Sequence, residues 1–235
     1  MNNTYNSYID REKSWLTFNA RVLQEANDAN VPLLDRFRFL GIFSNNLDEF
    51  FRVRYAAIRR MSLESAESEK ILGVKAEQLL KEITEIVIEQ QSESLRILNE
   101  IEKKLELENI FIINEKDISK EQEKFIHDYF IQKVSPALVT IMLNDLEEFP
   151  LLKDTSGYLA VKLVMNGSEI FNNKAKEIRY AVVEIPNTIN RFVVLPSNSE
   201  KQYIILLDDV IRYNLNNIFN IFDYESISAH MIKIT

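Results

Sequence analysis

Three consecutive polar residues, Ser44, Asn45 and Asn46, separate two apolar stretches and are the residues of this chain best suited to chemistry. A helix that begins here would expose free backbone N–H groups beside two carboxamides, and such a helix start can hold an anion or the edge of a base. An asparagine amide carries a donor and an acceptor side by side, which suits the N6/N1 or N6/N7 edge of adenine. Since one helix cap needs only one of these side chains, the triplet leaves a spare amide for a ligand.

Charged residues follow this triplet and bear on the same question. Asp48 or Glu49 can close a capping box or favour the positive end of a helix. Arg52 and Arg54 come next, on a basic helix, and at least one arginine of this helix could face phosphates. Residues 33–62 hold six arginines against three acidic residues, whereas the whole chain has a net charge of −8. An anionic ligand would therefore bind here, although the solvated face of a capped helix–turn–helix is the competing interpretation.

The sequence lacks the motifs by which many enzymes bind phosphate groups or metal ions. The four glycines lie too far apart for a phosphate-binding Walker loop or a Rossmann turn. There are no cysteines, and the two histidines, His127 and His230, lack metal-ligand spacing. Asp208 and Asp209 follow an apolar strand-like run, where helix capping explains them better than a metal-binding pair. We therefore expect no catalytic residue and no metal site in this chain.

The elements that must position the polar triplet are helices, which we expect to form a bundle of three or four over residues 1–105. Ser14 is the expected N-cap of the first helix, and Pro32 marks the start of the second. A turn is expected over Ser62–Glu69, and a long helix over residues 74–105 forms the spine of the bundle. The apolar positions of the first helix recur at helical spacing: Trp15, Phe18, Val22 and Ala26.

After residue 105 the pattern changes to short β-like runs mixed with helices, which predicts an α+β domain over residues 106–235. One helix is expected over Ser119–Val134, capped by Ser119, and another begins at Asp208 or Asp209. The last residues, Glu225–Thr235, are extended and apolar in character, so we expect the chain to be a piece of a longer protein. The fold class is thus α+β multidomain. The expected strands are Ile110–Ile113, Tyr158–Met165, Ile178–Ile185, Arg191–Leu195 and Tyr203–Leu207.

Composition, net charge and hydropathy limit the classes of protein to which this chain can belong. The chain has 235 residues, of which 46% are hydrophobic and 27% are charged, so it can build a core beneath an ordinary soluble surface. The net charge of −8 disfavours non-specific binding to nucleic acid. The N-terminal residues lack the apolar region of a signal peptide, and no apolar run is long enough to span a bilayer. A cytoplasmic protein is expected, with peripheral association with a membrane left open.

Long ungapped strings of this chain resemble the type 1 polyphosphate kinases. The resemblance covers essentially the whole chain, and its specificity is high because the matches are continuous rather than scattered. In the first domain the strings are Arg11–Leu23, Val31–Arg36 and Phe43–Arg54. In the second domain they are Tyr180–Pro186, Arg191–Pro196 and Leu206–Tyr213.

The resemblance implies a protein of four domains: an N-terminal helical domain, a head domain that helps to form a dimer, and two catalytic domains. Such enzymes transfer the terminal phosphate of ATP to polyphosphate through a phosphohistidine, with magnesium, and their catalytic histidines and metal ligands lie in the two C-terminal domains. This chain would then be an inactive N-terminal portion, truncated before those domains. The family's ATP-contacting asparagine corresponds to Asn46, and we add Asn45, Asp48 and Arg54 as weaker nucleotide-binding candidates.

Two alternatives remain open at this stage. One is a non-catalytic helical interaction module whose basic helix binds anions or a partner. The other is a separate regulatory relative of the full enzyme.

Overall fold

The computed structural model describes residues 10–63, 75–154, 156–166, 177–197 and 200–234. The chain divides into two compact units, Met1–Glu108 and Asn109–Thr235, and each is described by itself. The domain boundary expected after residue 105 falls inside the last turn of the helix that ends the first unit. Most of the turn expected over Ser62–Glu69 lies outside the described residues.

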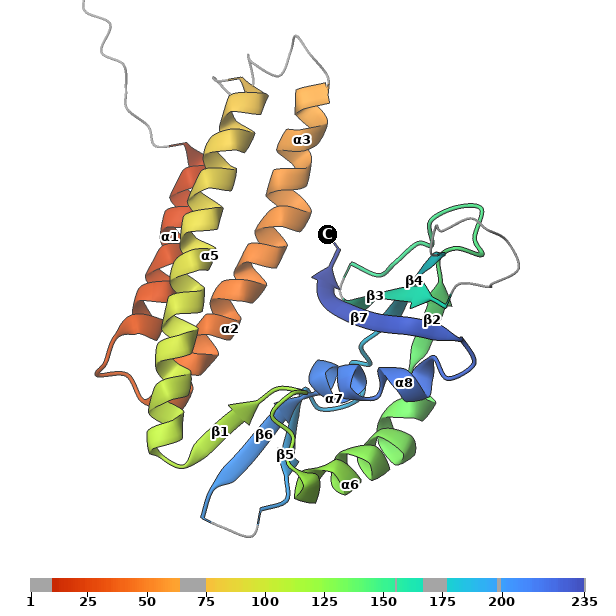
Figure 1. The fold of residues 1–235 in the computed structure, drawn as a ribbon. Coiled ribbons are helices and arrows are strands. Elements are labelled where there is room, and N and C mark those ends of the chain that lie inside the picture. The colour runs from red at the N-terminus through yellow and green to blue at the C-terminus, as the bar shows by residue number, and fades with distance from the viewer. Residues whose placement is uncertain (1–9, 64–74, 155, 167–176, 198–199, 235) are drawn as a thin grey trace, which may run out of the picture. The chain divides into compact units, whose positions relative to one another are not determined.

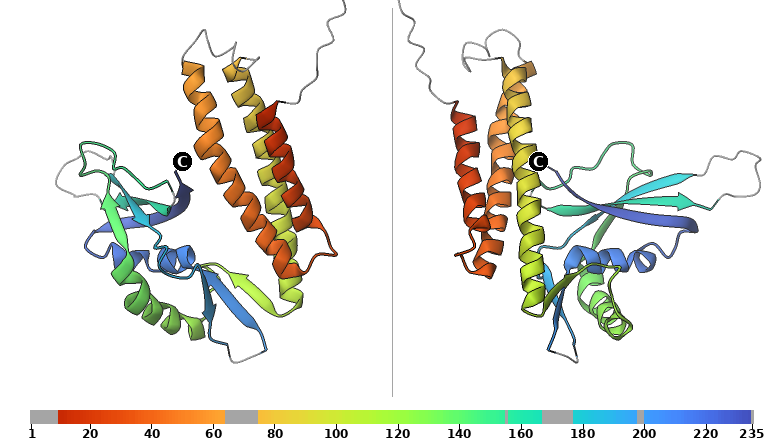
Figure 2. Two further views of the ribbon diagram at one scale, coloured as in Figure 1. Left: turned by 180° about the vertical axis from the view of Figure 1, so that it is seen from behind. Right: turned by 60° about the vertical axis from the view of Figure 1, so that its left-hand side comes forward.

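The first unit is a helical bundle in which α1, α5 and the rod formed by α2, η1 and α3 run side by side (Figure 1 and Figure 2). The expected long spine is present as α5, and its buried stripe includes Ile97. Gln90 lies within that stripe and is only half-buried. The helical elements are α1 (Arg11–Asn27), α2 (Leu33–Glu49), the π-helical η1 (Phe50–Tyr55), α3 (Ala56–Leu63) and α5 (Ala76–Leu107).

The helix break predicted at Ser44, Asn45 and Asn46 is wrong, because α2 runs through all three residues. The chain stays helical into η1, where the backbone N–H of Phe50 donates to the carbonyls of Asn46 and Leu47. Packing outweighs the weak helix propensity of asparagine here. The residues that the helix buries on one face across the triplet are Leu40, Phe43, Leu47 and Phe50. No helix start exposes its N–H groups at this point of the described chain.

Helix α1 also differs in detail from its expected form. Its N-cap is Asp10 rather than Ser14, because the Asp10 carboxylate accepts the backbone N–H groups of Glu12 and Lys13 at 2.9 and 3.2 Å. Its buried face lies about one residue away from the expected one, and Phe18 is 59% exposed. The buried residues of α1 are Glu12, Leu16, Asn19, Leu23 and Ala26. The start of α2 directly after Pro32 is as expected.

The second unit holds two sheets and confirms the α+β class. In the three-stranded sheet, ordered β1-β6-β5, β1 is parallel to β6 and β5 is antiparallel to it. The four-stranded sheet, ordered β2-β4-β3-β7, is antiparallel throughout. The strands are β1 (Ile110–Ile113), β2 (Val139–Met142), β3 (Gly157–Met165), β4 (Ile178–Glu184), β5 (Phe192–Leu195), β6 (Gln202–Leu206) and β7 (Tyr224–Lys233).

The helices of the second unit share one apolar core with both sheets. The Ser119 N–H donates to Oε1 of Gln122 at 3.0 Å, which confirms the expected start of α6. The expected capping by Asp208 or Asp209 is wrong, because Leu206 occupies the N-cap position and both aspartates lie buried in the first turn of α7. These elements are α6 (Lys120–Tyr129), the π-helical η2 (Phe130–Val134), η3 (Ser135–Ala137), α7 (Leu207–Tyr213) and α8 (Leu215–Ile218).

Across the described residues, no helix combines the length and the apolar character that crossing a bilayer requires.

Candidate functional site

The line of contact between α1 and the α2–η1 rod brings together the side chains of the helical unit that are best suited to bind a ligand. We call it the seam. It consists of three pairs that follow an antiparallel order along the two helices. The pairs are Glu12 with Arg54, Trp15 with Phe50, and Asn19 with Asn46.

Asn46 is held in the seam by a second amide. Its Nδ2 donates to Oδ1 of Asn19 at 3.0 Å, and Nδ2 of Asn19 donates to the Phe43 carbonyl at 3.2 Å. Asn19 has 0% exposure, whereas Asn46 is half-buried. Within the described part of the chain, Oδ1 of Asn46 has no hydrogen-bond partner. The amide of Asn46 therefore has one donor in use and offers its acceptor to a ligand.

Trp15 and Phe50 hold the middle of the seam. Their ring centroids lie 5.0 Å apart at an interplanar angle of 27°, which is a stacked pair. Phe50 is 1% exposed, so the stack fixes the spacing of the two helices one turn from Asn46.

Arg54 is committed to a carboxylate in the same seam. Its Nη1 donates to Oε2 of Glu12 at 2.7 Å, and its guanidinium lies 5.9 Å from the centroid of the Trp15 ring. Burial raises the pKa of Glu12, but hydrogen bonds from Arg11 and Arg54 outweigh it, so the pKa lies below its usual value. Glu12 is therefore an anion that partly neutralises Arg54, and the arginine does not stand as an unopposed phosphate ligand.

The other two nucleotide-binding candidates have different surroundings. Asn45 is exposed on α2, and its expected role as a helix cap is wrong because it lies inside the helix. Asp48 is half-buried on the same helix, in the last turn before η1, and likewise lies inside the helix rather than at its start. The structure thus brings Asn46 and Arg54 into one seam.

Sequence reasoning missed Glu12 and Asn19, the two buried partners. A signal for Asn19 is present in the sequence, because it lies among apolar residues at positions 16, 23 and 26 with helical spacing. A polar residue in such a stripe must find a hydrogen-bond partner when it is buried.

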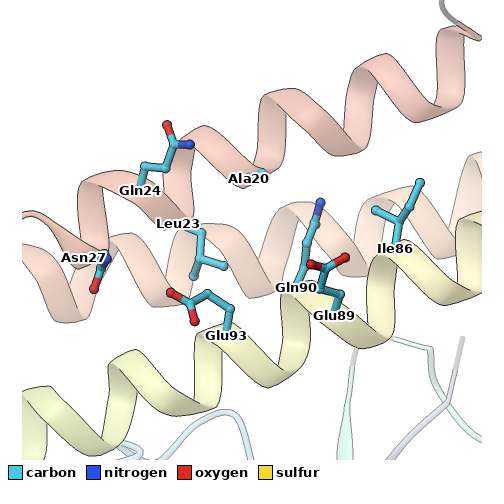
Figure 3. Close-up of a pocket in the computed structure, with 8 residues that line it drawn as sticks. All are labelled: Ala20, Leu23, Gln24, Asn27, Ile86, Glu89, Gln90 and Glu93. Carbon is cyan, nitrogen blue, oxygen red and sulfur yellow. The ribbon is translucent and has the colours of Figure 1, made fainter.

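A groove between α1 and α5, with a volume of about 370 Å³, lies on another side of α1 (Figure 3). Its lining carries the carboxylates of Glu89 and Glu93, so it does not favour an anion. Gln90 also lines the groove, and its Nε2 donates to the Leu16 carbonyl at 3.1 Å. This amide is a second polar bridge onto α1.

The second unit contains an ionic network around the start of α7, in which Asp208 and Asp209 are buried. Arg212 binds Asp209 and, at 3.2 Å, Glu115, while Arg191 lies 3.0 Å from Oδ1 of Asp208 without hydrogen-bond geometry. Burial and the charge of Asp208 raise the pKa of Asp209 to about 6. Every carboxylate in this network has an arginine partner, so we interpret the network as a structural link between elements.

The two histidines are exposed, His127 on α6 and His230 on β7. In the described ranges, no three His, Cys, Asp or Glu side chains are placed to hold a metal ion.

Comparison with protein families gives two matches that together cover most of the chain. Residues 8–113 match the polyphosphate kinase N-terminal domain. Residues 121–235 match the polyphosphate kinase middle domain.

Individual relatives agree with these matches. A polyphosphate kinase of Escherichia coli strain K12 is 39% identical over 235 residues, and one of Vibrio vulnificus strain YJ016 is 37% identical over 241 residues. In both cases the match covers 97% of this chain and 32% of the relative, so the chain spans about a third of their length. The crystal structure of polyphosphate kinase from Porphyromonas gingivalis matches with a TM-score of 0.80 and 28% identity, over 97% of this chain and 33% of that chain.

Proposed function

Because the chain belongs to the polyphosphate kinase family, we propose that it supplies the adenine-binding and middle domains of an enzyme that transfers the terminal phosphate of ATP reversibly to inorganic polyphosphate. In the forward direction a histidine nitrogen displaces ADP from the γ-phosphorus of ATP, and a terminal oxygen of polyphosphate then displaces the histidine. ATP and polyphosphate of n units thus become ADP and polyphosphate of n + 1 units.

The observation that carries the nucleotide-binding part is the half-buried amide of Asn46. One of its donors is occupied by Asn19, and its oxygen is available to a ligand. An amide held in this way suits the edge of adenine better than it suits a phosphate, because phosphate oxygens accept hydrogen bonds and need donors. The proposal assigns Asn46 to the base as the primary contact. Asn45, Asp48 and Arg54 are secondary candidates around the same nucleotide.

The phosphoryl-transfer chemistry belongs, in this proposal, to residues outside the chain. Neither His127 nor His230 is assigned as the nucleophile, because both are exposed and neither lies in the seam. Magnesium would act on the phosphates of ATP together with those other residues.

We include a homodimer in the proposal, formed through the middle domain in the cytoplasm. Strand β5 lies at the edge of its sheet, and two of its side chains, Phe192 and Val194, are 46% and 63% exposed. An edge strand with exposed apolar residues is a surface that proteins usually cover.

Steady-state kinetics of the full-length enzyme test the proposal. We expect Asn46→Ala to raise the KM for ATP several-fold, since losing one amide contact costs on the order of 1 kcal/mol, and to leave the KM for polyphosphate nearly unchanged. Gln90→Ala is the matched control, because it removes another half-buried interhelical amide, which reaches α1 from α5 rather than from the α2–η1 rod, and it should leave the KM for ATP unchanged. Equal KM values for ATP in the wild type and Asn46→Ala would refute the base contact.

A further inference from the structure

We propose that Asn19 is a positioning residue that fixes the orientation of the Asn46 amide, so that Asn46 presents its oxygen to the exocyclic amine of adenine and rejects a purine with an oxygen at position 6. This inference rests on the proposed contact between Asn46 and the base. It adds a residue with no ligand contact of its own and a specific reason for base selection.

The Phe43 carbonyl fixes the orientation of the Asn19 side-chain amide. A carbonyl oxygen only accepts hydrogen bonds, so the atom of Asn19 that faces it at 3.2 Å must be Nδ2. Asn19 has 0% exposure, so water cannot replace either of its partners if the amide turns over. The buried end of the pair therefore has one allowed orientation.

That orientation decides the next amide. With Nδ2 of Asn19 directed at Phe43, its Oδ1 faces Asn46 and requires a donor at 3.0 Å. Only Nδ2 of Asn46 can supply it. The oxygen of Asn46 is then directed away from Asn19, together with the second N–H of the same amide.

The two hydrogen bonds that join Phe43, Asn19 and Asn46 form a relay, and the neighbouring pairs of the seam hold the two helices in the register that it needs. The stack of Trp15 on Phe50 lies one turn away, and Glu12 binds Arg54 one turn beyond it. Sliding or rotating α1 against the α2–η1 rod would break both pairs at once. Asn46 is thus held by a rigid seam rather than by a single flexible contact.

An outward oxygen discriminates between purines. The N6 amine of adenine donates a hydrogen bond to it, whereas the O6 atom of inosine or guanine is a second acceptor and repels it. A site built around a hydrogen bond rejects an analogue that cannot make it, because polar groups are left unpaired.

Two substitutions at Asn19 separate orientation from stability in the full-length enzyme. Asn19→Leu removes the acceptor that orients Asn46, so the amide can turn its N–H groups toward O6. We expect the ratio of kcat/KM for ATP to that for ITP to fall about five- to tenfold, with an absolute rise in the use of ITP. Asn19→Asp keeps an acceptor facing Asn46, and we expect it to retain the wild-type ratio even though it buries a carboxylate beside the Phe43 carbonyl and lowers the melting temperature.

Controls distinguish the possible failures. Gln90→Leu removes the other amide bridge to α1 and should leave the ATP-to-ITP ratio unchanged. An unchanged ratio in Asn19→Leu, beside an Asn46→Ala variant with a raised KM for ATP, would overturn the relay and leave the proposed function intact. An Asn46→Ala variant with normal use of ATP would overturn both. A parallel loss of ATP and ITP use in Asn19→Leu would show that Asn19 acts only on stability.

Discussion

Asn45 and Asn46 are adjacent residues with opposite surroundings. Asn46 is half-buried and bonded to Asn19, while Asn45 is exposed in the interior of α2. In the helix interior alanine has the higher helix propensity, by roughly 0.5 kcal/mol. We therefore expect Asn45→Ala to leave the free energy of unfolding unchanged or to raise it by about that amount, as measured by urea denaturation. A loss of about 1 kcal/mol or more would mean that Asn45 makes a capping contact.

At this scale the sequence reveals which residues can do chemistry better than it reveals their partners. Asn46 and Arg54 are recognisable from their type and from the strings around them. Glu12 and Asn19 lie far away in the sequence and meet them only because α1 packs antiparallel to the α2–η1 rod. The orientation of an amide depends on such partners, so it is a property of the fold.

At the scale of elements, α2 contains a glycine at a position where the structure does not require one. Gly41 is exposed in the helix interior, and no described atom lies within 4 Å of a Cβ added there. Glycine costs roughly 0.5–1 kcal/mol relative to alanine in a helix, because the unfolded chain loses more freedom. Gly41→Ala should raise the free energy of unfolding by about this amount, as measured by urea denaturation.

A lower stability of Gly41→Ala would show that another part of the protein packs against this turn. Ala20→Gly on α1, at a half-buried helical position, gives the comparison in the opposite direction and should lower stability.

The ionic network around α7 gives the middle unit a distinct dependence on pH. Asp209 has a pKa of about 6 in the fold against an ordinary value of 3.8. The folded protein thus holds a proton that the unfolded chain releases between these values, so the contribution of Asp209 to stability is full below pH 3.8 and is lost as pH rises through about 6.

Asp209→Asn keeps a neutral side chain that can donate to Glu115 at every pH. We expect it to raise the free energy of unfolding by about 1–2 kcal/mol at pH 7.5 and to match the wild type near pH 4, as measured by urea denaturation across this range. Asp208→Asn is the control, because it removes the partner of Arg191 but leaves the buried Asp209 carboxylate in place, so the fall in stability with rising pH should remain. Parallel pH profiles for wild type and Asp209→Asn would contradict the assignment.

Elements with strong periodicity are the ones that sequence predicts best. The spine α5 and the strands β3, β4 and β6 follow from apolar spacing and from the polar residues that bound them. The triplet before Leu47 leads to the wrong prediction of a helix break, because its residues favour turns and caps by propensity. The apolar residues on both sides of it share one buried face, and their packing keeps the helix continuous.

At the scale of the whole molecule, the two units match the first two domains of enzymes that are about three times as long. We expect this chain alone to transfer no phosphate from ATP to polyphosphate and to gain no label from γ-labelled ATP. Phosphohistidine formation needs a histidine positioned against phosphate-binding groups, and His127 and His230 are exposed. Labelling that disappears in His127→Ala or His230→Ala would make the chain an enzyme by itself.

The π-helical segment η1 has a consequence for how sequences of this family should be aligned. Phe50 and Ile58 are both buried, although in a regular α-helix residues eight positions apart differ by about 80° around the axis. One extra residue in a wide turn removes about 100° of winding, which returns Ile58 to nearly the same side as Phe50. The segment thus works as a one-residue insertion that sets the phase of α3. A relative with an unbroken α-helix should carry a single-residue gap between positions 50 and 55, and deleting one residue there would turn the apolar side of α3 away from α5.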